Sequence, residues 1–275
     1  MKILFLGDVV GRAGLEAVVQ KLPLLKEKLS PDAIIINAEN AAGGFGLTAK
    51  IANLLFDSNV DCITLGNHAW DQTEMLRHID KDPRIVRPMN YPEGTPGKGF
   101  HVLEIKNGKK LLIINILATI HMGKPFNDPF EIMRNFLKKH ELSGNYQIFI
   151  DFHGEASSEK MAMGHAFDGK VTAVIGSHTH IPTADDHILP NGTAYMTDAG
   201  MCGDYDSVIG MKKESSVWGF EKKTPSPERR EPAKGEASVC GAIIISDDAS
   251  GKAVSIEPFR IGGILKETHQ LNHKA

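Results

Sequence analysis

Short apolar segments alternate with helical patterns along most of this chain, and this alternation is the strongest constraint on its fold. Buried strands are expected at residues 2–7, 33–36 and 62–65, where apolar runs are stopped by polar residues. Leucine and valine recur at helical spacing over residues 15–29, where Pro23 is expected to kink or split the helix. Strands separated by helices pair in parallel through right-handed crossovers. The pattern therefore predicts an α/β fold.

The middle of the chain departs from strict alternation. Thr48 is expected to cap a helix that ends near Asp57, and Thr73 begins a third helical pattern. Runs at residues 101–105 and 109–116 flank Asn107-Gly108, which predicts an antiparallel hairpin and hence a mixed sheet.

The C-terminal half returns to alternation. Helices are expected at residues 129–140 and from Ser158 onward, and strands are expected at residues 147–152, 171–175, 237–245 and 253–259. The last two strands are expected to pair at a sheet edge.

Composition excludes several classes of protein. The chain has 275 residues, 41% of them hydrophobic and 24% charged, with a net charge of -3. These values are ordinary for a globular protein and argue against a strongly basic nucleic-acid-binding surface.

The first apolar run is too short for a signal peptide, so a cytoplasmic protein is expected. Three widely separated cysteines predict buried, reduced thiols. We expect a single domain over residues 1–275.

Residues 211–236 differ from the rest of the chain. They contain three prolines and many charges of both signs, with Val217, Trp218 and Phe220 as the main apolar side chains. A solvated surface loop is one interpretation. A lid or an oligomerisation arm docked through Trp218 is the other, because loops of this length in compact domains are often functional.

Polar side chains with metal-binding groups follow five of the expected strands. They are Asp8, Glu39, Asn40, Asn67, His153, His178 and His180. The carboxyl ends of parallel strands meet at one edge of a sheet, so these side chains are expected to lie together. Carboxylate, amide and imidazole ligands suit manganese, iron or zinc. A carboxylate that bridges two such ions would suit hydrolysis at phosphorus by a metal-bound hydroxide.

These residues lie in motifs that resemble a known family. The segments are GDVVGRAG, NAENAAGGFGLT, TLGNHAWD, DFHGEASSEK and IGSHTHIPTAD. In this order they resemble the calcineurin-like metallophosphoesterases, and within that superfamily the bacterial YmdB-type phosphodiesterases. The resemblance covers nearly the whole chain. It implies a four-layer αββα sandwich of two mixed sheets flanked by helices, and a phosphoric diester hydrolase.

The resemblance also implies roles for individual residues. One ion would be held by Asp8, Glu39, Asn40 and His180, and the other by Glu39, Asn67, His153 and His178. Glu39 would bridge the two ions, and His68 would be the general acid. Iron is the metal that the family implies, with manganese or another divalent transition metal as the alternative. Val10 stands where the wider superfamily has a histidine, which leaves the first position with fewer nitrogen ligands.

Three other positions are weaker candidates for the site. Arg12 precedes a helix and could meet a phosphate, or could be an ordinary exposed arginine. The glycine-rich segment 43–46 could shape the pocket and stack a base on Phe45, or could be a flexible turn. Asp151 could orient a ligand from behind, or could be an ordinary strand-end residue.

Two functions compete at this point. The first is a phosphodiesterase that acts on 2',3'-cyclic and also 3',5'-cyclic nucleotides, and that forms a homo-oligomer. The second is a regulatory protein that binds a metal, RNA or a protein partner and has weak or vestigial phosphoesterase activity. Residues 211–236 and Val10 motivate the second.

Overall fold

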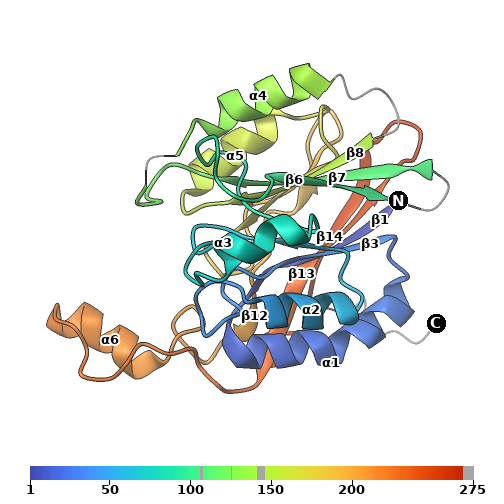
Figure 1. The fold of residues 1–275 in the computed structure, drawn as a ribbon. Coiled ribbons are helices and arrows are strands. Elements are labelled where there is room, and N and C mark those ends of the chain that lie inside the picture. Colours follow the sequence, from blue (N-terminus) through green and yellow to red (C-terminus); the bar gives the residue numbers. More distant parts are fainter. Residues whose placement is uncertain (106–107, 125, 141–145, 269–275) are drawn as a thin grey trace.

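Two mixed β-sheets stacked face to face form the centre of the molecule, with helices on both outer faces (Figure 1). The computed structural model describes residues 1–105, 108–124, 126–140 and 146–268. In this part of the chain, one apolar cluster lies between the sheets and one lies under the helices of each outer face. Three filled interfaces separate four layers, so the expected αββα sandwich is confirmed.

The first sheet has eight strands, with β1 near its centre. Its path is β2 (Asp8–Val9), β12 (Met201–Asp204), β13 (Ala237–Ser246), β1 (Lys2–Leu6), β3 (Ala33–Asn37), β4 (Cys62–Thr64) and β5 (Ile85–Val86), and β14 (Ala253–Ile261) pairs with β13. The strands from β1 to β5 along this path are parallel, as the alternation predicted.

The expectation that both C-terminal strands lie at an edge is wrong for β13. This strand pairs with β1 on one side and with β12 and β14 on the other. The reason is burial on both faces, because nine of its ten residues are buried. A strand that reads as a nearly continuous apolar run belongs inside a sheet.

The second sheet has six strands. Their order is β10 (His187–Ile188), β11 (Ala194–Met196), β9 (Ala173–Ser177), β8 (Tyr146–His153), β7 (Lys110–Leu117) and β6 (Phe100–Glu104). β6 and β7 form the expected antiparallel hairpin, in which Phe100 faces Ile114. Asn107, expected in its turn, lies outside the described residues.

Amphipathic helices cover the sheets. The first sheet is covered by α1 (Gly11–Leu29) and α2 (Ala49–Asp57), with the short α3 (Met75–His78) and the 3-10 turn η1 (Ile79–Lys81) beside them. The second sheet is covered by α4 (Pro129–His140) and α5 (Ser157–Ala166). α1 is not split at Pro23. Thr48 caps α2 as expected, because its side chain accepts a hydrogen bond from the Ile51 backbone N–H at 3.3 Å.

Two further observations concern the whole molecule. Cys62, Cys202 and Cys240 are buried and unpaired, as expected. Within the described ranges, no helix combines the length and the apolar character that crossing a membrane requires.

Packing between the sheets aligns the strand ends that carry the candidate ligands. The rings of Phe5 and Phe149, one from each sheet, lie 5.1 Å apart in the central cluster. β1, β3 and β4 are neighbours in the first sheet, and β8 and β9 are neighbours in the second. Their carboxyl ends therefore meet at one edge of the sandwich.

Residues 211–236 form an arm whose residues are largely exposed, as expected of a solvated surface segment, but the arm contains a helix and is not a loop throughout. The arm contains α6 (Lys213–Lys222), which projects from the body of the molecule (Figure 1). Its base is closed by a hydrogen bond from the Lys212 backbone N–H to the Glu231 carbonyl at 2.9 Å. Trp218 is not docked on the body through its indole, which donates to Thr224 within the arm. The helix was not predicted because the segment as a whole is charged and contains prolines. The prolines all follow Lys213–Lys222, so this stretch is long enough and free enough of breakers to form a helix.

Candidate metal centre

The ring of His153 is the centre of the candidate site. Its Nε2 lies 2.9 Å from Glu39 Oε1, 3.0 Å from Asn67 Oδ1 and 3.0 Å from His178 Nδ1. Nitrogen and oxygen lone pairs thus converge on a small volume, and the two oxygens have no proton to donate. One ring proton cannot satisfy this many acceptors, whereas a metal ion accepts several lone pairs at once. Glu39, His153 and His178 together meet the distance requirement for a shared ion.

Buried oxygens without hydrogen bonds mark the same place. Among the described residues, Asp8 Oδ1, Glu39 Oε1 and Asn40 Oδ1 are buried and make no hydrogen bond. Burying such groups is costly unless a partner is supplied. These residues therefore fit divalent cations, which are the partners that carboxylate and amide oxygens accept.

Backbone carbonyls orient two of the outer candidate ligands. The Asn40 side-chain nitrogen donates to the Gly44 carbonyl at 3.0 Å, which leaves its oxygen facing inward. His180 Nδ1 lies 2.8 Å from the Ile209 carbonyl. Because a carbonyl only accepts, the proton sits on Nδ1, and Nε2 is left as a ligand atom.

Burial and the charges around His153 shift the pKa values of several of the candidate ligands. Burial lowers the pKa of His153, but the carboxylates of Glu39, Asp8 and Asp151 outweigh burial and raise it to about 9. Burial followed by the charge of His153 lowers the pKa of His178 to about 3. Burial raises the pKa of Asp8 to about 6. The carboxylates thus keep the ring of His153 protonated, at the position where a metal cation would be bound.

Asp151 lies directly behind His153, as the weaker hypothesis proposed. One of its oxygens accepts from Ser177 Oγ at 2.5 Å, and that hydroxyl lies 2.9 Å from His153 Nδ1. Its other oxygen accepts from Thr64 Oγ1 at 2.5 Å and from Asn37 Nδ2 at 3.0 Å. The ring of His153 is therefore oriented by a fully buried network.

The turn that carries His178 and His180 is held in an unfavourable conformation. Both histidines have positive φ, 95° and 68°, which residues other than glycine seldom adopt. Asp198 stabilises the turn, because its Oδ2 accepts from Thr179 N at 3.0 Å and from Thr179 Oγ1 at 2.7 Å. Lys160 Nζ pairs with the same oxygen at 2.9 Å, and both charged side chains are at most 1% exposed. Sequence reasoning missed Lys160 and Asp198, since no local pattern shows that a lysine is buried.

Gly66 permits the close approach of the ligands. A Cβ at this position would lie 2.2 Å from Glu39 Oε2 and 2.4 Å from His153 Nε2. No side chain fits there, so the residue before Asn67 has to be glycine.

A cavity of about 280 Å³ opens beside the ligands. Its lining includes Phe45 and His68, which supports the pocket role considered for the glycine-rich segment, and also Glu155, which sequence reasoning missed. The ring of Phe45 contacts that of His68 edge-on, with centroids 5.1 Å apart. His68 Nδ1 lies 2.7 Å from Asp71 Oδ2. Arg12 does not line this cavity: it is exposed and paired with Glu16 on α1.

Val10 lines the same cavity, together with Met211 at the base of the arm. Gly210, the residue before the arm, leaves room for the Val10 side chain, because a Cβ there would lie 2.6 Å from Val10 Cγ1. The departure from the superfamily pattern at Val10 thus lies beside the point where the arm begins.

Comparisons with known proteins agree with this geometry. A family model described as "YmdB-like protein" matches residues 4–259. A Bacillus subtilis protein named 2',3'-cyclic-nucleotide 2'-phosphodiesterase is 48% identical over 261 residues, which cover 95% of this chain and 97% of that protein. A crystal structure of a phosphatase from Mycoplasma pneumoniae superposes with a TM-score of 0.89 at 36% identity, covering 100% of this chain and 97% of the other. A Thermus thermophilus protein titled hypothetical gives a TM-score of 0.88 at 40% identity, covering 96% of this chain and 100% of the other.

The Lys160–Asp198 pair provides a test of what holds the turn. Asp198→Asn is expected to lower the free energy of unfolding by about 3–5 kcal/mol, because it leaves a buried ammonium without a counter-charge. Asp206→Asn is the matched control, since it breaks an exposed pair with Lys213 and should cost about 1 kcal/mol or less. Urea unfolding measures both. Equal losses for the two variants would contradict the role given to Asp198.

Metal binding should depend on pH through His153. Its pKa of about 9 means that the ring is protonated at neutral pH, and a ligand histidine has to be neutral. Binding of Mn²⁺ should therefore release a proton, and affinity should rise about tenfold per pH unit between about pH 6 and 8. Calorimetry in two buffers of different ionisation enthalpy counts the protons. Binding of Mn²⁺ without proton release would refute the role given to His153. His187 is exposed, so the His187→Ala control should release as many protons as the unaltered protein.

Proposed function

Because this chain belongs to the YmdB-like family of calcineurin-like metallophosphoesterases, we propose that it is a phosphodiesterase that opens 2',3'-cyclic nucleotides. The observation that carries the proposal is the convergence of Glu39, Asn67, His153 and His178 beside an open cavity. The name of the Bacillus subtilis relative supports the substrate class. Activity toward 3',5'-cyclic nucleotides is part of the proposal.

Two divalent cations are proposed for the site. One would be held by Asp8, Glu39, Asn40 and His180, and the other by Glu39, Asn67, His153 and His178. Bound cations would neutralise the substrate phosphate and make water a better nucleophile near neutral pH. The mixture of oxygen and nitrogen donors supports iron, with manganese as the alternative.

His68 is proposed to donate the proton that the leaving oxygen needs. Its backbone N–H donates to Glu39 Oε2 at 2.9 Å, which places the residue at the edge of the ligand cluster. Asp71 Oδ2 binds Nδ1, so Nε2 is the nitrogen available to the substrate. A ribose alkoxide is a poor leaving group, and protonating it lowers the barrier to P–O cleavage.

The walls of the cavity suit a nucleoside. Phe45 offers an apolar ring on which a base can stack, next to His68. A volume of about 280 Å³ is close to the lower limit of ordinary ligand pockets. The terminal nucleotide of a substrate is therefore the part that this cavity accommodates.

Metal content and hydrolysis test the proposal together. The purified protein should contain two metal ions per chain and should hydrolyse 2',3'-cyclic AMP and bis-p-nitrophenyl phosphate. Asp8→Ala and Asn67→Ala should lose metal and at least about a hundredfold in kcat/KM. Activity that survives both substitutions, or that is unaffected by complete removal of metal, would refute it.

The role of His68 predicts a dependence on the leaving group. His68→Ala should lower kcat for 2',3'-cyclic AMP by about 10²–10⁴-fold, because the leaving alkoxide needs a proton. The same variant should lose much less with bis-p-nitrophenyl phosphate, whose leaving group is stable as an anion. Steady-state kinetics on both substrates, with His187→Ala as the control, checks this. Equal losses on both would show that His68 does not act as the acid.

We also propose a homo-oligomer that is formed through the outer face of α6. Val217 and Trp218 are 43% and 37% exposed there. Apolar groups exposed together mark interaction surfaces. Sedimentation velocity at micromolar concentration should show an assembly larger than a monomer, and Trp218→Ser should weaken it. A monomer at all concentrations would exclude this part of the proposal.

A further inference from the structure

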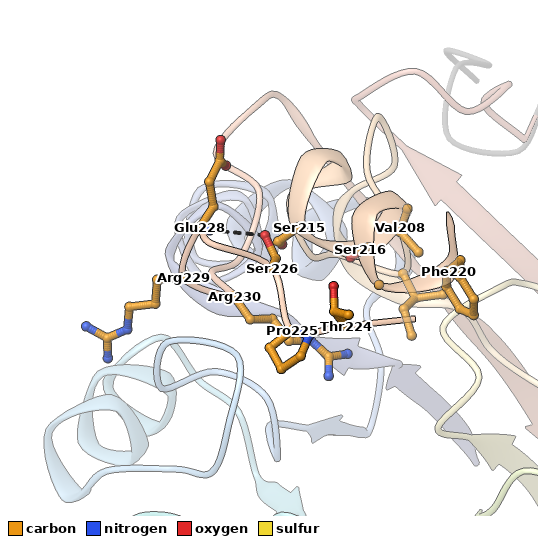
Figure 2. A pocket seen from close by; sticks show the side chains of 12 residues that line it. Val208, Ser215, Ser216, Phe220, Thr224, Pro225, Ser226, Glu228, Arg229 and Arg230 are labelled. Carbon is orange, nitrogen blue, oxygen red and sulfur yellow. Dashed lines mark hydrogen bonds between the residues drawn. The ribbon is translucent and has the colours of Figure 1, made fainter. Parts of the chain in front are cut away.

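A second and larger cavity, of about 640 Å³, lies within the arm (Figure 2). One face of α6 forms one wall through Ser215, Ser216, Gly219 and Phe220, and the returning segment from Thr224 to Arg230 forms the other. Val217 and Trp218 do not line it, although the Trp218 indole donates a hydrogen bond to Thr224, which does. The cavity therefore adjoins the surface proposed for self-association without including the two apolar side chains of that surface.

The two cavities adjoin each other. Ile209 and Arg230 line both the cavity beside the metal ligands and the cavity of the arm. The Ile209 carbonyl also binds the ring of His180. A ligand that extends out of the first cavity past these two residues thus enters the second.

Arg230 stands at this junction with its charge free. Its guanidinium carbon lies 5.9 Å from the centroid of the Phe45 ring. Within the described part of the chain, Arg230 makes no ion pair, whereas the nearby Lys212 is paired with Glu231 at 3.0 Å. Glu228 also borders the arm cavity, but its carboxylate points away from Arg230 (Figure 2). A free guanidinium between two cavities is suited to an anion.

Phe220 supplies an aromatic surface in the arm cavity. Its side chain is 70% exposed, which is costly for a phenyl ring that no other part of the protein covers. Arginine and exposed aromatic rings in one groove are the usual combination for binding single-stranded nucleic acid, because rings stack on bases and cations bind phosphates.

We propose that the substrate is longer than a mononucleotide: a single-stranded RNA end that carries a terminal 2',3'-cyclic phosphate. The terminal nucleotide lies in the cavity beside the metal ligands. Arg230 binds the next phosphodiester along the strand, and the preceding base stacks on Phe220. The inference rests on the proposed function, and the reaction is unchanged. Water cleaves one P–O bond of the cyclic phosphate, which leaves a phosphomonoester on one ribose oxygen and a hydroxyl on the other.

Kinetics on two substrates of different length test the proposal. The probes are 2',3'-cyclic AMP and an adenosine dinucleotide that ends in a 2',3'-cyclic phosphate. The protein should favour the dinucleotide by at least about tenfold in kcat/KM, the order of one charge-assisted contact. Arg230→Ala should lose about tenfold more on the dinucleotide than on the mononucleotide. Arg134→Ala is the matched control, because Arg134 is an exposed arginine of α4 that lines neither cavity, and its variant should keep the preference.

Several outcomes would overturn the proposal. These are equal kcat/KM on the two substrates, equal losses for Arg230→Ala on both, or loss of the preference in Arg134→Ala. Phe220→Ala should also reduce the preference. If it instead dissociates an oligomer and leaves the preference intact, a second copy of the chain occupies the arm cavity and the proposal is wrong.

A binding measurement separates this proposal from the proposed function. Fluorescence anisotropy with a labelled dinucleotide that bears a 3'-phosphate requires no turnover. Binding at least about tenfold weaker in Arg230→Ala than in Arg134→Ala supports the arm site, and equal binding overturns it. The protein could show this difference in binding and yet hydrolyse no cyclic phosphate. That outcome would refute the proposed function and leave the arm as a binding site for RNA ends.

Discussion

The face-to-face packing of the two sheets is the constraint on which the rest of the structure depends. The candidate ligands lie in β2 and after β3 and β4 in one sheet, and at or after the ends of β8 and β9 in the other, so no single sheet holds them all. The apolar cluster between the sheets, with Phe5 against Phe149, sets their spacing and brings the strand ends to one edge. A buried core that is remote from the reaction thus determines the distance between Glu39 and His153.

Acceptors outnumber donors once these strand ends meet. The carboxylates raise the pKa of His153, and three buried oxygens of the candidate ligands, Asp8 Oδ1, Glu39 Oε1 and Asn40 Oδ1, are left without hydrogen bonds. Hydrogen-bond donors and charged side chains that surround the candidate ligands hold these acceptors in place. Ser177 links Asp151 to the ring of His153, and Lys160 with Asp198 fixes the turn at His178. Each outer group lies at a strand end or on a neighbouring helix, so the architecture of the site continues that of the sheets.

Much of the fold followed from sequence because the signals were local. Apolar runs, the Thr48 cap and the alternation of strands and helices depend on neighbouring residues, and the structure has the elements they predicted. Placement of β13 and the helix in the arm were not predicted, because both depend on which surfaces become covered after folding. The candidate ligands were chosen from local signals too, since each lies at or beyond the end of an expected strand and their order matches known motifs. Asp198, Lys160 and Arg230 were not predictable from local signals. The sequence does not show whether a charged side chain is buried, or whether it has an ion-pair partner, because both depend on its surroundings in three dimensions.

The buried supports behind the histidines also bear on which metal the protein uses. Asp151 through Ser177, the Ile209 carbonyl and Asp198 fix the ligands through contacts within the chain, so the site does not need an ion to take its shape. For the proposed metal centre, folding would then not depend on metal loading. A preformed set of oxygen and nitrogen donors selects weakly among divalent ions, so the ion held there would be set by which of them the surroundings supply.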